Sequence, residues 1–343
     1  MTGKTTRMFA ETSEIPRVLA RQISEGLPIY FEAADWLRGL SPSLFVTCAR
    51  GTSDHAATYF KYLMETSAGI PVASIGPSVA SVFDAPLKLE RGVCLTISQS
   101  GGSPDLVALQ ASAARGGAQT IALLNTVNSP VGTAAERVLP SLAGPEISVA
   151  ATKSFIASLF AVAALNARLN RDEALEDALR RLPAIAERAL ALEWQGLSVS
   201  LTQAATAFVV SRGPGLALAG EIALKLKEVA RLHAEAFSAA EVRHGPMALA
   251  AKELAVLAFV TDDASRQSVV NSARSLETAG ATVAVAGANV TGCASLPTAE
   301  SPHPLLTPLC QAITFYRFVE AFARARGLDP DAPLHLRKVT ETI

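Results

Sequence analysis

Three ionisable residues in the second half of the chain recur at a spacing that suits proton transfer. Glu221, Lys225 and Glu228 are separated by four and three positions, so on a helix they form one stripe of carboxylate, ammonium and carboxylate. His244 follows in the sequence RHGP, just before a sharp turn. An imidazole together with such a stripe suits the movement of a proton on a carbon next to a carbonyl group. Taken alone, the Glu221 and Lys225 pair is also the pattern of an ordinary ion pair on a helix surface.

The helix that must carry this stripe is predicted from an apolar pattern beside it. Ile222, Leu226, Val229 and His233 lie at helical spacing and predict one face of a 3.6-residue period. The pattern places His233 on that apolar face, where we expect it in the core or at an interface. The charged stripe lies beside this face, at the margin of burial, where neighbouring charges and desolvation shift pKa values.

A second chemical signal lies in two loops rich in hydroxyl groups and glycine. The segments RGTS (50–53) and SQSGGS (98–103) each follow a short apolar run and lead directly into a helix pattern. Backbone N–H groups, hydroxyl donors and a helix N-terminus together favour a bound phosphate. The alternative is that these residues only form turns, with Ser103 as a helix N-cap. The candidate phosphate-binding residues are Gly51, Thr52, Ser53, Ser98, Gln99, Ser100 and Ser103.

The elements around these loops follow the alternation that is typical of parallel α/β sheets. Short apolar runs at 44–48, 72–75, 92–98, 120–124 and 137–139 alternate with helical patterns, and an alanine-rich helix follows at about 152–169. Ligands of such sheets bind beyond the carboxyl ends of the strands, where both hydroxyl loops are expected.

The same alternation of strand and helix patterns occurs again about one domain length later in the chain. The run LFVTCARGTSDHAATYFKYLME from Leu44 aligns with AFVVSRGPGLALAGEIALKLKE from Ala207, which predicts two copies of one domain. We therefore expect an α/β protein with two tandem domains, each a three-layer α-β-α sandwich around a parallel sheet of the Rossmann-like or flavodoxin-like kind. The predicted parts are a helical arm (1–40), the first domain (41–170), a helical linker (171–195), the second domain (196–326) and a C-terminal tail (327–343).

The second copy lacks the hydroxyl loop. Where the first copy has SQSGGS, the second has Thr261 followed by Asp262 and Asp263. Two carboxylates would repel a phosphate, so the sequence predicts one phosphate site per chain.

Composition excludes several classes of function. Half of the 343 residues are hydrophobic and the net charge is −1, which predicts real cores and disfavours a nucleic-acid partner. The four cysteines and five histidines are scattered, so neither a metal site nor a disulfide framework is expected. No apolar run is long enough to span a membrane, and the N-terminus lacks a secretory signal, so we expect a cytoplasmic protein.

The motifs together resemble a known family. The strand followed by RGTS, the segments ISQSG and SPD, VAATKSF, GEIALKLKE, HAEAF and AAEVRHGP, and a lysine in the tail resemble proteins with tandem sugar isomerase (SIS) domains. The resemblance is strongest to the isomerase half of glucosamine-6-phosphate synthase and to the stand-alone amino-sugar-phosphate deaminases and deglycases. It covers nearly the whole chain.

This resemblance implies a role for each matching residue. Glu228 would be the base that moves a proton between C1 and C2, with Lys225 and Glu221 shaping its field and assisting ring opening. The two hydroxyl loops would hold the phosphate of the sugar, and the backbone at Val149 would contact sugar hydroxyls.

Two further roles are implied by the resemblance. His244 would open the sugar ring in the active site of the neighbouring subunit, which implies a homodimer. Lys338 would form a Schiff base with an open-chain ketose. No cofactor and no metal are implied.

The sequence also departs from the synthases. The chain begins MTGKTTRM, without a glutaminase domain, so we expect no glutamine-dependent synthesis by this polypeptide alone. ARGTS and SQSGGSPD stand where the synthases have CGTS and SQSGET, and both changes resemble the deaminase branch. The expected reaction is glucosamine 6-phosphate, or another hexosamine phosphate, to fructose 6-phosphate and ammonia. A fructosamine-phosphate deglycase, a plain sugar-phosphate isomerase and a non-catalytic sugar-phosphate sensor remain as alternatives.

Overall fold

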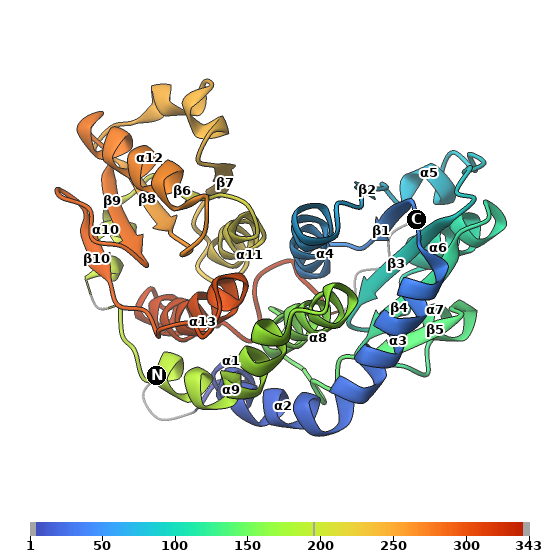
Figure 1. Cartoon of the computed structure of the whole chain (residues 1–343). Helices are drawn as coiled ribbons and strands as arrows, with labels where there is room; N and C mark the ends of the chain where they lie inside the picture. The colour runs from blue at the N-terminus through green and yellow to red at the C-terminus, as the bar shows by residue number, and fades with distance from the viewer. Residues whose placement is uncertain (1–4, 195, 339–343) are drawn as a thin grey trace. The chain divides into compact units, whose positions relative to one another are not determined.

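The computed structural model describes residues 5–194 and 196–338, which form two compact units (Figure 1). Among these residues, 17–147, 153–180 and 337–338 form what we call the N-sheet unit. The C-sheet unit comprises 5–16, 148–152 and the described part of 181–336. Two of the chain's passages between the units fall within helices, α2 (Ile15–Arg21) and α9 (Glu173–Leu190). The N-terminal arm and the linker therefore each contribute residues to both units.

The N-sheet unit is built on five parallel strands in the order β2-β1-β3-β4-β5. The strands are β1 (Leu44–Cys48), β2 (Val72–Ser74), β3 (Gly92–Ser98), β4 (Gln119–Leu124) and β5 (Arg137–Pro140). All seven residues of β3 are buried, as expected of a central parallel strand that is covered on both faces. The predicted strands are confirmed, and β1 and β3 match the expected bounds to the residue.

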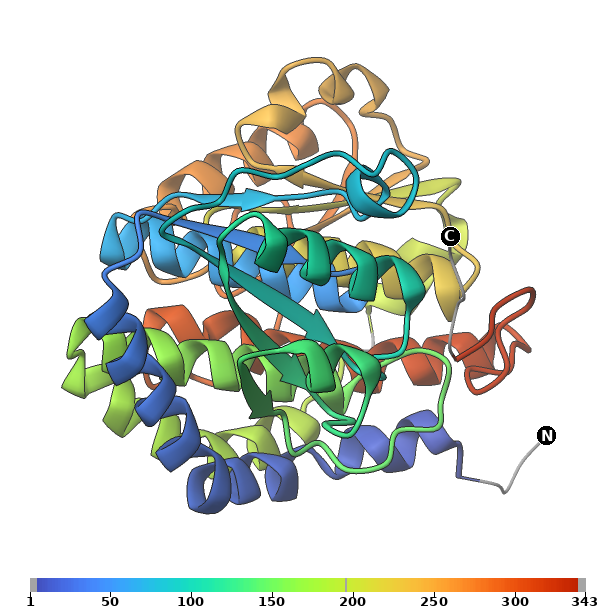
Figure 2. The same cartoon turned by 90° about the vertical axis from the view of Figure 1, so that its right-hand side faces the viewer.

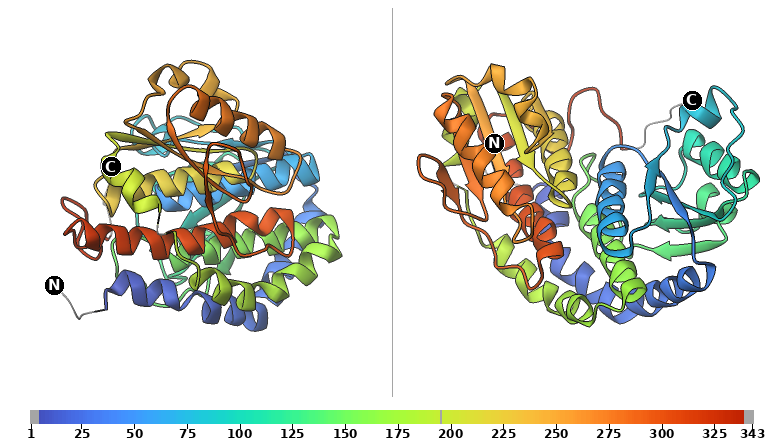
Figure 3. Two further views of the ribbon diagram at one scale, coloured as in Figure 1. Left: turned by 90° about the vertical axis from the view of Figure 1, so that its left-hand side faces the viewer. Right: turned by 45° about the horizontal axis from the view of Figure 1, so that its top comes forward.

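Helices cover both faces of this sheet. In the right panel of Figure 3, α4 and α8 lie on one side of the strands and α6 on the other, and Figure 2 shows α6 in front of the sheet. Apolar side chains of β1, β3 and α6, including Val46, Cys94 and Leu109, form the core on the α6 side. The helices are η1 (Gln22–Gly26), α3 (Leu27–Leu40), α4 (Thr52–Leu63), η2 (Met64–Ala68), α5 (Ser78–Ser81), α6 (Pro104–Arg115), α7 (Pro130–Ala134) and α8 (Lys153–Asn170).

The C-sheet unit repeats this architecture. Its parallel strands have the order β7-β6-β8-β9-β10, which in chain order is the same pattern of second, first, third, fourth and fifth strand. This order is that of flavodoxin-like sheets, and it confirms the predicted pair of three-layer α/β domains. The strands are β6 (Thr206–Ser211), β7 (Ala234–Ser238), β8 (Leu254–Phe259), β9 (Thr282–Ala286) and β10 (Ala294–Leu296).

Within the C-sheet unit, α11 lies on one side of the sheet and α12 on the other (Figure 1). The core on the α12 side includes Phe208, Val256 and Val269. The helices are α1 (Arg7–Ser13), α10 (Leu197–Gln203), α11 (Gly215–Glu228), η3 (Glu241–Arg243), η4 (Pro246–Leu249), α12 (Arg266–Thr278), η5 (Pro304–Leu306) and α13 (Thr307–Ala325). No helix in the described ranges is both long and apolar enough to cross a membrane.

One helix prediction is wrong at its end. Helix α11 stops at Glu228, and Arg231 adopts a left-handed conformation (φ 52°), so the chain has left the helix before His233. The His233 side chain is exposed, and its Nδ1 lies 2.8 Å from the hydroxyl of Thr206. It is therefore neither on an apolar helix face nor in the core.

Candidate functional site

The two hydroxyl loops of the N-sheet unit lie at the same edge of the sheet. Strands β1 and β3 are hydrogen-bonded neighbours, and each leads through its loop into a helix, α4 or α6. Because the strands are parallel, their carboxyl ends meet at the edge where open α/β sheets bind ligands. The structure thus brings the residues of RGTS and SQSGGS to adjacent strand ends.

The loop after β3 is held in shape by its own serines. The hydroxyl of Ser98 accepts the N–H of Gly101 at 3.0 Å, and that of Ser100 accepts the N–H of Gly102 at 3.4 Å. Gly101 has a φ of 62°, and a Cβ added there would lie 2.2 Å from Oγ of Ser129. The position therefore demands glycine, and the loop is preorganised before any ligand arrives.

Ser103 is also expected as the N-cap of a helix. It occupies that position, but only its backbone, and not its side chain, makes capping hydrogen bonds. Its carbonyl accepts the N–H groups of Leu106 and Val107 at the start of α6. Its hydroxyl makes no capping hydrogen bond. The helix start is therefore formed without that hydroxyl, which leaves the N-terminal N–H groups of α6 and the Ser103 side chain at the loop.

An ion pair that the sequence analysis missed joins the two loops. Nε and Nη2 of Arg50 lie 3.0 and 2.9 Å from Oδ2 of Asp105, the second residue of α6. The Asp105 side chain is fully buried, whereas that of Arg50 is 53% exposed. The pair places a guanidinium group beside loops that otherwise offer only neutral donors. In the sequence, the only indication of this ion pair is that an arginine directly precedes Gly-Thr-Ser and an aspartate directly follows Ser-Pro.

The acid–base stripe lies in the C-sheet unit on α11. Nζ of Lys225 is 2.7 Å from Oε2 of Glu228 and 3.3 Å from Oε1 of Glu221. The side chains of Glu221 and Lys225 are 0% and 1% exposed, and only Glu228 reaches solvent, at 22%. The interpretation of Glu221 and Lys225 as an ordinary surface pair is therefore wrong, because both lie inside the unit rather than at its margin.

A tyrosine from another helix completes this cluster. The buried Tyr316 on α13 donates a hydrogen bond to Oε1 of Glu221 at 2.9 Å. Burial disfavours the Lys225 ammonium, but the charges and hydrogen bonds of the two glutamates outweigh that effect and raise its pKa. Lys225 therefore remains charged, and Glu228 is the member of the cluster that a substrate can reach.

His244 lies in the turn between η3 and η4 and is exposed. No side chain or backbone group in the described part of the chain is hydrogen-bonded to its ring. An accessible imidazole of this kind can accept or donate a proton. Its predicted role in a neighbouring subunit remains a prediction.

The last two predicted residues fall in different units. Val149 is half-buried in a bend of the C-sheet unit. Lys338 belongs to the N-sheet unit, where its Nζ lies 3.2 Å from Oε2 of Glu146. The rest of the predicted tail, 339–343, lies outside the described residues, as do residues 1–4 of the arm.

Each unit thus holds one part of the predicted chemistry. The N-sheet unit brings together the two hydroxyl loops, and Lys338 belongs to the same unit. The C-sheet unit brings together Glu221, Lys225 and Glu228.

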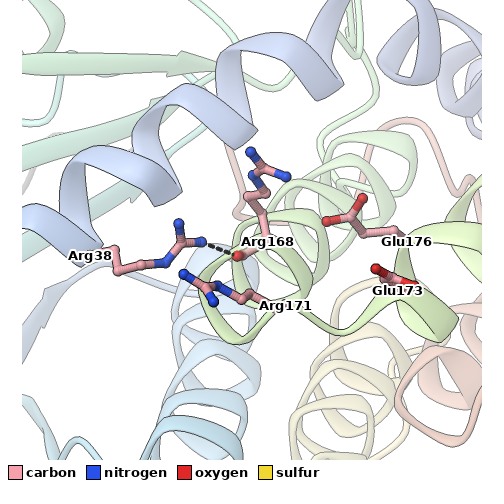
Figure 4. A pocket seen from close by; sticks show the side chains of 5 residues that line it. All are labelled: Arg38, Arg168, Arg171, Glu173 and Glu176. Carbon is pink, nitrogen blue, oxygen red and sulfur yellow. Dashed lines mark hydrogen bonds between the residues drawn. The ribbon is translucent and has the colours of Figure 1, made fainter.

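A hollow of about 330 Å³ elsewhere in the N-sheet unit contains none of these residues (Figure 4). It is lined by Arg38, Arg168, Arg171, Glu173 and Glu176. Arg38 donates to the carbonyl of Arg168, and the guanidinium of Arg168 pairs with Asp35 at 3.0 Å. Three arginines and two glutamates line the hollow, and Asp35 outside the lining pairs with Arg168, so little net charge is left to bind an anion.

Comparison with known proteins agrees with this architecture. The SIS domain model matches residues 43–168 and 200–316. The glutamine--fructose-6-phosphate aminotransferase of Halobacterium salinarum is 33% identical over 96% of this chain, which spans 58% of that relative.

Two solved structures are also similar. A protein of Silicibacter pomeroyi named as a phosphosugar isomerase is 42% identical, with a TM-score of 0.91 over 95% of this chain and 100% of the other. The glucosamine-6-phosphate deaminase of Thermotoga maritima shares the fold, with 20% identity and a TM-score of 0.77 over 98% of this chain and 100% of the other. The two matched segments cover most of the chain, one in each sheet repeat, and the chain belongs to the SIS domain family.

Proposed function

We propose that this protein is an enzyme that converts glucosamine 6-phosphate and water to fructose 6-phosphate and ammonia, without a cofactor. The observation that carries the proposal is the cluster on α11, in which the buried Lys225, itself paired with the buried Glu221, holds the partly exposed Glu228. A carboxylate fixed by a charged lysine is suited to take a proton from a substrate carbon and return it to the next one. The name of the Thermotoga maritima relative makes glucosamine 6-phosphate the first substrate to test.

The phosphate of the substrate binds at the hydroxyl loops of the N-sheet unit. Thr52, Ser53 and Ser103 offer hydroxyl groups at two helix starts, where N–H groups and the helix dipole favour an anion. The loop after β3 adds Gln99 and Ser100. Because these groups are neutral donors on a preorganised backbone, they bind a phosphate without the lysine of a nucleotide-binding loop.

The chemistry begins with ring opening and proceeds through a proton shift. His244 assists opening of the sugar to its aldehyde, and Glu228 moves the C2 proton to C1 through an enolamine. The product is an imine at C2. Lys338 exchanges with this imine and releases ammonia, and water then hydrolyses the lysine imine to the ketone. The proton that O1 gains when the enolamine forms is balanced by the proton that the nitrogen loses when the imine forms.

A coupled assay tests the proposal. Purified protein is incubated with glucosamine 6-phosphate, and ammonia and fructose 6-phosphate are measured together. We expect both products in equal amounts. No turnover of any hexosamine phosphate would defeat the deaminase proposal, and tight binding of those sugars without turnover would indicate a sensor.

A plain sugar-phosphate isomerase is the second candidate. It is favoured by the name of the Silicibacter pomeroyi relative, which is the more similar of the two structures in sequence. The same proton shift by Glu228 converts an aldose phosphate to a ketose phosphate without ammonia. Glucose 6-phosphate and a fructosamine 6-phosphate, assayed beside glucosamine 6-phosphate, separate the isomerase and deglycase reactions from deamination.

The proposed assembly is a homodimer. The exposed imidazole of His244 is available to a substrate in a second copy of the chain. Mixing a His244→Ala variant with a Glu228→Gln variant tests this. Partial recovery of activity in the mixture is expected of a shared site, and no recovery would place both residues in one chain's site.

A further inference from the structure

The C-terminal tail carries a lysine that meets a buried carboxylate 192 residues earlier in the chain. Nζ of Lys338 lies 3.2 Å from Oε2 of Glu146, a side chain with no exposed surface. Lys338 itself is 23% exposed. The glutamate is inaccessible and the lysine is accessible, so a ligand that reaches this pair meets the amine first.

Glu146 is held rigidly between β5 and α8. Its Oε1 accepts the N–H of Ser154 at 3.1 Å, and its Oε2 accepts the Ser154 hydroxyl at 2.6 Å. Both donors come from the first turn of α8. The carboxylate is thus oriented by the helix start, and its Oε2 faces the lysine with a fixed position.

We propose that Glu146 is a further catalytic residue, which holds Nζ of Lys338 and takes its proton when that nitrogen attacks a ketose carbonyl. The inference rests on the proposed function, and the attack on the ketose is the reverse of the hydrolysis of the Lys338 imine proposed there. The geometry is that of a nucleophile and its base at hydrogen-bond distance, with the base oriented by a third group, here Ser154.

The proton balance of the step is complete within this pair and the substrate. The ammonium of Lys338 gives one proton to Glu146, and the free amine forms a bond to C2 of the ketose. The carbinolamine then loses its oxygen as water, with one proton from nitrogen and one from Glu146. The net change is ammonium and ketone to protonated imine and water, and Glu146 returns to its carboxylate form.

Reductive trapping tests the inference directly. The protein is treated with fructose 6-phosphate and borohydride, and the sugar-modified peptide is measured by mass spectrometry over time. We expect modification of Lys338 in the wild type. In Glu146→Gln the rate of modification should fall by about 100-fold, the usual contribution of a general base. Glu146→Asp, which keeps a carboxylate, should recover part of that rate.

Controls separate chemistry from folding. Glu136→Gln changes another carboxylate of the same unit, one that accepts the backbone N–H of Thr120 at 3.1 Å, and should trap like the wild type. Binding of sorbitol 6-phosphate, which has no carbonyl and forms no imine, should be equal in all variants. If Glu146 only docks the tail, trapping and sorbitol 6-phosphate binding would fall together, and the inference would be overturned.

The remaining outcomes are also decisive. If the wild type traps at Lys338 and Glu146→Gln traps equally fast, Glu146 is not the base. If the wild type produces ammonia but no adduct at Lys338, the inference is overturned while the proposed function stands. If Glu146→Gln does not fold, the Glu146→Asp variant decides by the same comparison of trapping with binding. Absence of turnover together with absence of an adduct would overturn both.

Discussion

The two sheet repeats carry a glutamate at matching positions, in η2 directly after α4 and at the end of α11, and hold it differently. In the repeat alignment, Glu65 corresponds to Glu228. Glu65 pairs with the partly exposed Lys61 and accepts the N–H of Val72 at 3.1 Å, so it fastens the helix end to β2. Within residues 5–194 and 196–338, Glu228 has no such backbone partner and is held by the buried Lys225. The fold fixes the position, and the neighbouring residues decide whether its carboxylate fastens the backbone, as at Glu65, or stays partly exposed beside a buried lysine, as at Glu228.

The loops after the third strand of each repeat show the same division. In the C-sheet unit, Asp263 accepts the Thr261 hydroxyl at 2.8 Å and the N–H of Ser265 at 2.7 Å. In the second repeat, a carboxylate of the chain itself thus occupies donors of the loop that corresponds to Ser98–Ser103, the loop of the proposed phosphate site. Phosphate binding is therefore proposed for the first repeat and not for the second.

The largest expected effect separates the two glutamates. Glu228→Gln should lower turnover by about 100- to 10,000-fold while sugar-phosphate affinity stays within a few-fold, because only the proton transfer is lost. Glu65→Gln is the matched control and should keep turnover. Steady-state assays and calorimetric binding of both variants check this. Equal losses in the two variants would remove the functional difference between the repeats.

Substitution of Lys225 should lower the free energy of unfolding more than substitution of Lys61. Lys225→Met leaves Glu221 and Glu228 without their shared cation in a buried place, which should cost about 3–5 kcal/mol in the free energy of unfolding. Lys61→Met removes a half-exposed partner and should cost at most about 1 kcal/mol. Urea unfolding of both variants measures the difference, and equal costs would contradict the burial argument.

Because the pKa of Lys225 is raised in the folded protein, its contribution to the free energy of unfolding depends on pH. Its pKa is raised in the folded protein, so the stabilisation is complete below the unfolded value, about 10.4, and is lost only as pH rises further, through the folded pKa. The difference in unfolding free energy between wild type and Lys225→Met should therefore be constant from neutral pH to about pH 9 and shrink above that.

The sequence predicts the elements of both repeats better than the contacts that make a site. Continuous apolar runs fix β1 and β3 to the residue, because central parallel strands are buried on both faces. The end of α11 was missed because the apolar period continues through Val229 and His233 without a glycine or proline to mark the turn. The periodicity carries no information on the left-handed residue that ends the helix.

Site contacts between distant residues could not be read from local patterns. The spacing of Glu221, Lys225 and Glu228 predicts one stripe, but their depth of burial depends on how α13 packs against α11. The pairs of Arg50 with Asp105 and of Glu146 with Lys338 span 55 and 192 positions. Such pairs follow from topology, which sets which loops and tails meet.

A glycine substitution compares the tightness of the turns in the two repeats. Gly101 and Gly213 both have a φ of 62°, but an added Cβ meets Ser129 at Gly101 and open space at Gly213. Gly101→Ala should cost about 2–4 kcal/mol, from backbone strain and the clash, and should weaken phosphate binding. Gly213→Ala should cost only about 1 kcal/mol, from the backbone alone. Thermal unfolding and binding of inorganic phosphate measure both effects.

The smallest expected effect on turnover comes from removing the hydrogen bond that Tyr316 donates to Glu221 in the α11 cluster. Tyr316→Phe removes one hydrogen bond to Glu221 and leaves the ring in place, so it should cost about 1.5–3 kcal/mol, the range for a hydrogen bond to a charged group. Because Lys225 still balances Glu228, turnover should fall by much less than in Glu228→Gln. Tyr59→Phe, at another fully buried tyrosine in α4 of the first repeat, is the control and should leave turnover unchanged. A loss of turnover in Tyr316→Phe as large as that of Glu228→Gln would mean that the tyrosine, and not the lysine, sets the reactivity of this helix.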